Sequence, residues 1–96
     1  MKYHNFRGRK FKIFFGPIKN RNHLGTCDEG SKEIEIRSTL EGEELLDSLI
    51  HEALHACFPD IVDGAINDSA TSIASFLGRL GYRREDEQTS KKTSKK

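Results

Sequence analysis

The centre of the chain holds the stretch Leu45-Leu46-Asp47-Ser48-Leu49-Ile50-His51-Glu52-Ala53-Leu54-His55. Its apolar residues recur at the three- and four-residue spacing of an amphipathic helix, and we expect a helix over residues 41–57. His51 and His55 are four residues apart, so they lie on one face of that helix and can bind one metal ion together. Glu52 lies one step round the helix, within reach of a water molecule on that ion.

This H-E-x-x-H spacing predicts a zinc-dependent metallopeptidase. In such a site two imidazoles bind Zn²⁺, and Glu52 acts as general base on the zinc-bound water that attacks a peptide bond. The competing interpretation is two surface histidines with a helix-favouring glutamate between them.

A catalytic zinc ion normally takes three protein ligands, and no histidine follows His55. The candidates for the third ligand are Asp60, Asp63 and Asp68, with His4 and His23 as more distant choices. Helical geometry favours Asp63, which falls on the same face as Ala70 and close to that of Ile66, whereas Asp68 falls on the opposite face. A first-turn acid that only complements the helix dipole is the alternative for Asp63.

Three strands are expected before the motif helix. They cover Lys10–Phe15, with Phe6 as an alternative start, then Leu24–Cys27 and Glu33–Arg37. Gly16-Pro17 breaks the first strand, and the turn residues Asp28-Glu29-Gly30-Ser31 join the other two in a hairpin. We therefore expect an α+β fold with a small antiparallel sheet of about three strands, packed on the motif helix and a second helix.

The limits of both helices also have sequence signals. Ser38 and Glu41 match a capping box for the motif helix, and Phe58-Pro59 ends it. The second helix is expected from about Ile61 to Leu80, with Gly81 as its C-terminal cap. Its apolar stripe is predicted to comprise Ile66, Ala70, Ile73, Leu77 and Leu80.

Composition indicates one domain over residues 1–84 and a disordered basic tail over residues 85–96. The net charge is +1, but the seven Lys and Arg residues before Asp28 meet no acid. These basic ends could contact nucleic acid, but charge balance with the acidic half and a solvated tail are the favoured explanation. No segment has the length of a membrane span or the apolar centre of a signal peptide. With Cys27 and Cys57 as free thiols, these features predict a cytoplasmic protein.

The motif residues and their order resemble the minimal zincin core of the gluzincin type. They are most similar to small phage and bacterial proteins of the ImmA/IrrE group, over roughly residues 24–83. The resemblance implies a second helix that carries an acidic ligand, with Asp63 at that position and Asn67 one turn later. Asp63 stands where the family has a glutamate. The resemblance also places the protein in a host cytoplasm if a phage encodes it.

Three kinds of function remain open at this level. The first is a zinc peptidase that acts as a monomer and binds its substrate as an added strand along Leu24–Cys27. The second is a zinc-binding regulatory module without turnover, and the third is an accessory protein associated with nucleic acid. His23 and Tyr82 are candidates for a second group that stabilises the oxyanion.

Overall fold

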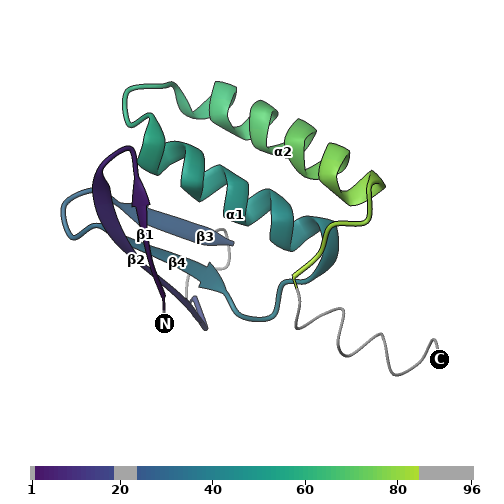
Figure 1. Cartoon of the computed structure of the whole chain (residues 1–96), viewed down its shortest axis with the longest axis horizontal. Helices are drawn as coiled ribbons and strands as arrows, with labels where there is room; N and C mark the ends of the chain where they lie inside the picture. The colour runs from purple at the N-terminus through teal and green to yellow at the C-terminus, as the bar shows by residue number, and fades with distance from the viewer. Residues whose placement is uncertain (1, 19–23, 85–96) are drawn as a thin grey trace.

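The computed structural model describes residues 2–18 and 24–84 and confirms a small α+β fold. Its elements are β1 (Lys2–Phe6), β2 (Arg9–Gly16), β3 (Gly25–Asp28), β4 (Glu33–Arg37), α1 (Gly42–Cys57) and α2 (Asp63–Arg79). Helix α1 lies between the sheet and α2, which packs on its outer side (Figure 1). The expected tail over residues 85–96 lies outside the described residues.

The sheet has four strands in the order β1-β2-β4-β3 and is mixed, so the prediction of an antiparallel sheet is wrong. Strand β4 pairs antiparallel with β3, as the predicted hairpin requires, but it pairs parallel with β2. After β2 the chain crosses to the far edge as β3 and returns as β4 between the two. This central place suits β4 because Ile34 and Ile36 are both buried there.

The strand missed by the sequence analysis is β1, which pairs antiparallel with β2. The two are joined by the two-residue turn Arg7-Gly8, whose φ angles are +52° and +85°. Two successive positive φ angles give the tight turn that matches the twist of a hairpin. β1 itself is polar and largely exposed, so it carries little of the hydrophobic pattern that identifies a strand.

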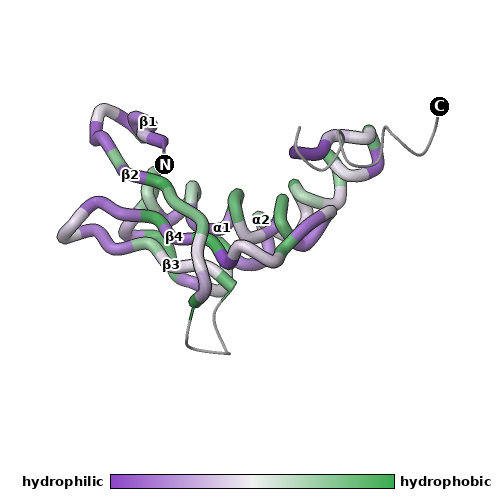
Figure 2. Tube along the Cα trace, turned by 90° about the horizontal axis from the view of Figure 1, so that it is seen from below, coloured by the Kyte–Doolittle hydropathy of each residue, from purple (hydrophilic) through white to green (hydrophobic). Residues whose placement is uncertain are grey.

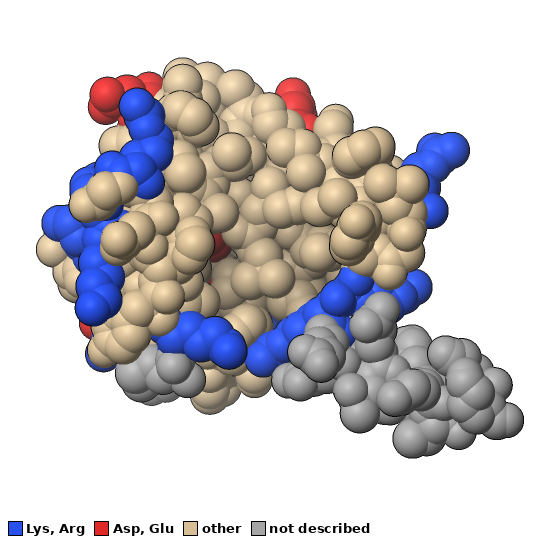
Figure 3. Space-filling model, in the orientation of Figure 1, with Lys and Arg blue, Asp and Glu red and all other residues tan. Residues whose placement is uncertain are grey.

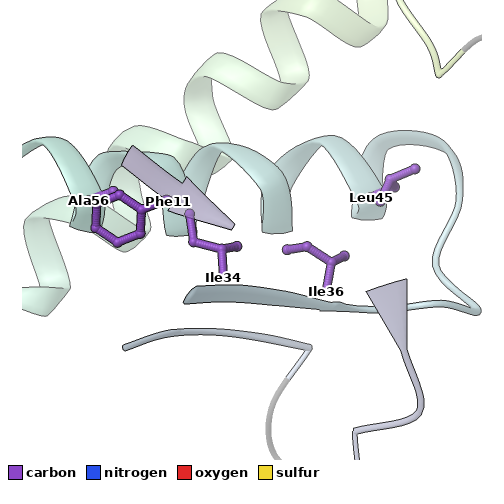
Figure 4. Packing of buried hydrophobic residues seen from close by; sticks show 5 residues of the cluster. All are labelled: Phe11, Ile34, Ile36, Leu45 and Ala56. Carbon is purple, nitrogen blue, oxygen red and sulfur yellow. The ribbon is translucent and has the colours of Figure 1, made fainter. Parts of the chain in front are cut away.

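The core lies between the inner face of the sheet and α1. Figure 4 shows five of its buried residues, which come from β2, β4 and both ends of α1: Phe11, Ile34, Ile36, Leu45 and Ala56. Among the described residues, only Phe11 and Ile36 are both large and fully buried. Such a small core leaves room for a bound metal ion to contribute to stability.

Helix α1 covers the predicted span, but the predicted capping box does not form. Glu41 is the N-cap residue, and its side chain makes no capping hydrogen bond. Ser38 donates its backbone N–H to the Gly16 carbonyl, and Leu40 donates to Arg37. A short turn therefore separates β4 from α1, and it leaves Ser38 beside the sheet rather than at the start of the helix.

Helix α2 ends as predicted but packs on a different set of residues. Gly81 has φ +90°, and the N–H groups of Gly81 and Tyr82 bond back to Gly78 and Leu77, which is a Schellman cap. The buried residues are Ile66, Ala70 and Ala74, whereas Ile73 and Leu80 are 39 % and 60 % exposed. The prediction that both belong to the buried stripe is wrong, because α2 packs on α1 through small side chains at four-residue spacing.

Among the described residues, no helix is long and apolar enough to cross a membrane. Cys27 and Cys57 are free thiols, as expected.

Candidate metal centre

Both motif histidines lie half-buried on one face of α1. Their Nε2 atoms are 3.2 Å apart, and their ring centroids are separated by 4.8 Å. The helix therefore aims the two imidazole nitrogens at one point, as the four-residue spacing predicts.

Asp63 brings a carboxylate oxygen to the same point. Its Oδ1 lies 2.9 Å from Nε2 of His55 and 3.9 Å from Nε2 of His51. Asp63 is the first residue of α2, and the connection after α1 is short and tightly turned, with Phe58 N–H bonded to Leu54 and Ile61 N–H bonded to Phe58. The start of α2 is thus fixed beside the last turn of α1.

The three donor atoms fit a tetrahedral zinc ion. Ligands about 2.0–2.1 Å from such an ion lie about 3.3 Å from each other. The observed separations of 3.2, 2.9 and 3.9 Å surround that value. Two imidazoles and one carboxylate are also a common protein ligand set of catalytic zinc sites, which leaves a fourth position for water or substrate.

Glu52 points toward this centre from the buried side of α1. Its side chain is 6 % exposed, and the ligand atoms of His51, Glu52 and His55 all lie within 4.8 Å of one another. Burial, followed by the nearby charge of Asp63, raises the pKa of Glu52 from 4.5 to about 7. A carboxyl group with this pKa can both accept and release a proton near neutral pH.

Burial also acts on His51. Together with the neighbouring His55, it lowers the pKa of His51 below the ordinary value of 6.5. His51 is therefore neutral at pH 7, which is the form that binds a metal ion.

Close packing by β3 fixes the position of Glu52. A Cβ atom added to Gly25 would lie 3.2 Å from Cγ of Glu52 and 3.1 Å from the Ile36 side chain. Glycine thus lets the strand approach the helix at this level. The sequence analysis did not single out Gly25, since a glycine at the start of a short strand has no distinctive pattern.

The other predicted ligands do not join the centre. Asp60 and Asp68 are exposed and do not line the cavity at the site. His4 lies on β1, which forms the opposite edge of the sheet from β3 (Figure 2). His23 lies outside the described residues.

Tyr82 does not support the oxyanion role considered for it. It is 60 % exposed and follows the C-terminal end of α2, whereas Asp63 begins that helix. Cys27 does line the cavity, but burial and the charge of Glu29 raise the pKa of its thiol to about 12. The thiol therefore stays protonated and is a poor metal ligand.

A cavity of about 640 Å³ opens at the centre, between β3, α1 and the start of α2. Besides the four site residues, its walls include three further acids, Glu29, Glu44 and Asp47, and no lysine or arginine from the part of the chain that the structure describes. The sequence analysis did not single out Glu44 and Asp47 as site residues. Their spacing of seven and four residues before His51 is the signal that could have placed them on the same face.

No protein-family model, curated protein or solved structure matches this chain.

Proposed function

We propose that this chain is a zinc-dependent peptidase with a minimal zincin core, similar to the ImmA/IrrE group. The observation that carries the proposal is the convergence of His51, His55 and Asp63 beside a buried glutamate. Two chain segments supply these groups in a geometry that suits one tetrahedral ion and leaves a side open to the cavity.

His51, His55 and Asp63 would hold the metal. When bound, zinc lowers the pKa of a coordinated water toward ~7 and polarises the carbonyl group under attack. The neutral state of His51 supports this assignment, because a protonated imidazole has no free lone pair for a metal.

Glu52 is assigned the proton transfers. Its pKa of about 7 lets it take a proton from the attacking water. It then gives that proton to the amine that leaves when the peptide bond breaks. Its burial next to Gly25 keeps the carboxylate on the cavity side of the helix.

The substrate is proposed to add as a strand to β3. Within residues 2–18 and 24–84, β3 has a paired neighbour only on its β4 side. Arg37 donates its N–H to the Leu24 carbonyl, so the alternation of an antiparallel ladder directs the backbone groups of Gly25 and Cys27 to the free side. Both residues line the cavity, where an extended peptide would meet them.

We propose the cytoplasm as the place of action, supported by the two free cysteines. A monomer suffices for the activity, since one chain supplies all three ligands and Glu52.

The test uses zinc-loaded protein and a library of peptides prepared from a digested bacterial proteome, with new termini identified by mass spectrometry. Wild-type protein should cleave a subset of peptides and lose this activity in EDTA. Glu52→Gln should retain zinc but cleave about 10²–10⁴ times more slowly, because it cannot accept the proton. Undiminished cleavage by Glu52→Gln would disprove the mechanism. Stoichiometric zinc without any cleavage would instead favour a zinc-binding module without turnover.

A further inference from the structure

The charge of the cavity wall is one-sided. Five carboxylates line it, those of Glu29, Glu44, Asp47, Glu52 and Asp63, and no Lys or Arg of residues 2–18 and 24–84 does. Asp63 and Glu52 belong to the reaction centre, and Glu29 forms an ion pair with Arg9 at 2.7 Å. Glu44 and Asp47 are the two acids of the wall that neither role accounts for.

Asp47 is held in a fixed position. Thr71 on α2 donates its hydroxyl to Oδ2 of Asp47 at 3.0 Å. This bond ties the carboxylate to the second helix and leaves Oδ1 without a hydrogen bond to any residue in the described ranges. A carboxylate with one oxygen fixed and one oxygen open is well placed to accept from a cationic group.

A second observation also indicates that the cavity takes a ligand. Glu52 lines it with only 6 % of its side chain exposed, yet it makes no hydrogen bond or ion pair to any residue of the described chain. Buried polar groups are usually hydrogen-bonded, so Glu52 is a group that awaits a partner from the cavity.

Helix geometry gives the distance of Asp47 and Glu44 from the reaction centre. Asp47 and Glu44 precede His51 by four and seven residues on the same face, which corresponds to about 6 and 10 Å along the axis. An extended peptide advances about 3.4 Å per residue. A side chain that meets these two acids thus belongs to a residue two or three positions from the bond at His51 and His55.

The direction of β3 determines whether this peptide residue lies N-terminal or C-terminal to that bond. Gly25 lies beside Glu52, while Glu29 at the other end of β3 is linked through Arg9 to the Ala56 carbonyl at the end of α1. The strand therefore runs in the same direction as α1. A peptide that pairs antiparallel with β3, the more stable arrangement, runs the opposite way, with its C-terminal part toward Asp47 and Glu44.

We infer that the cavity selects peptides with Lys or Arg two or three residues C-terminal to the bond presented to His51 and His55, and that Glu44 and Asp47 bind this cationic side chain. The inference rests on the proposed peptidase function and specifies its substrate class. A basic side chain of this length reaches the acids from an added strand. Among the described residues of the wall none is a Lys or Arg, so a basic ligand would supply the counter-charge.

The experiment measures binding so that it does not depend on turnover. Zinc-loaded Glu52→Gln protein is immobilised and exposed to a random ten-residue peptide library, and retained peptides are sequenced. Lys and Arg should be enriched at one position of the aligned peptides. Adding Glu44→Gln and Asp47→Asn should reduce that enrichment about five- to tenfold, as expected for two partly exposed ion pairs.

The matched control is Glu43→Gln with Asp68→Asn, which removes two exposed carboxylates, one on α1 and one on α2, that do not line the cavity. It should leave the enrichment unchanged, and circular dichroism should give both double variants folded at the assay temperature. An equal loss in the two double variants, or retained peptides without a basic preference, would overturn the inference.

Selected peptides are then offered to wild-type protein. Cleavage two or three residues before the basic position supports both the inference and the proposed function. Binding with the basic preference but no cleavage would reject the peptidase and keep the cationic site. Cleavage that shows no basic preference would keep the peptidase function and reject the cationic site.

Discussion

The two edges of the sheet use charge in opposite ways. At the β1–β2 edge, Arg7 donates to the Cys57 carbonyl at 3.1 Å, and Arg9 donates to the Ala56 carbonyl while pairing with Glu29. Lys and Arg side chains gather over this hairpin at the left of Figure 3. At the β3 edge the described residues of the cavity wall include acids and imidazoles but no Lys or Arg.

The difference separates charge that holds the fold together from charge left for a ligand. The last carbonyls of a helix have no partner within it and carry negative partial charge, so the two arginines satisfy the end of α1. In the cavity, Glu29 is paired with Arg9, but Glu44, Asp47 and Glu52 form no ion pair with any residue that the structure describes. Substitutions at the first edge should therefore change stability, and substitutions at the second should change metal binding and chemistry.

The largest expected effect is at the cavity edge. His51→Ala or His55→Ala should abolish stoichiometric zinc binding, because each removes one of two imidazoles aimed at one point. In excess zinc each variant should also lose the stabilisation that metal binding adds, about 2.7 kcal/mol at a hundredfold excess over Kd. Metal analysis and thermal unfolding with and without EDTA measure both effects. Full zinc content in both variants would contradict a zinc site at this position.

The next test compares two acids on α2. Asp63→Ala should weaken zinc affinity by more than the ~10–100-fold typical of changes beyond the ligands themselves, whereas exposed Asp68→Ala should not. Titration against a competing chelator gives both affinities. If Asp63 only complements the helix dipole, its removal would cost a little stability and leave zinc affinity as it was.

In metal-free protein, the buried carboxylate of Glu52 should lower the free energy of unfolding at high pH. Because the folded pKa of Glu52 is raised from 4.5 to about 7, the folded protein retains a proton over this range that the unfolded chain releases. Stability from this group therefore falls as pH rises through the range and stays low above it. Glutamine cannot ionise. The free energy of unfolding of Glu52→Gln, taken relative to that of the wild type, should therefore rise by on the order of 2 kcal/mol between pH 5 and pH 8.

Urea unfolding in EDTA at both pH values measures this difference, with exposed Glu43→Gln as the control. A Glu52→Gln advantage that is the same at pH 5 and pH 8 would refute the raised pKa.

The smallest expected effect lies at the hairpin edge. Arg9→Ala removes the partly exposed ion pair with Glu29 and the donor to Ala56, so it should lower the free energy of unfolding by about 1–1.5 kcal/mol. Exposed Lys2→Ala on the same hairpin should change it by less than about 0.5 kcal/mol. Denaturant unfolding compares the two variants. Equal losses in the free energy of unfolding would show that the contacts of Arg9 do not stabilise the end of α1.

Local patterns were enough to predict much of the molecule. The helical spacing of apolar residues placed α1 and α2 within two residues of their ends, and the alternation Glu33–Arg37 with its turn gave the β3–β4 hairpin. The i, i+4 spacing of His51 and His55 and the helix phase of Asp63 predicted three groups that the structure brings together. These features depend on residues close in sequence, whose geometry the helix or turn dictates directly.

Other features depended on contacts between distant segments. The parallel pairing of β2 with β4 follows from where the chain crosses the sheet, which no local pattern encodes. The exposure of Ile73 and Leu80 follows from packing through Ala70 and Ala74 against α1. Three further features arise because β3, the β1–β2 hairpin and α2 meet around α1: the acidic cavity wall, the buried position of Glu52 and the hydrogen bond from Arg9 to Ala56. Burial and local charge are set by that tertiary assembly and not by the local sequence.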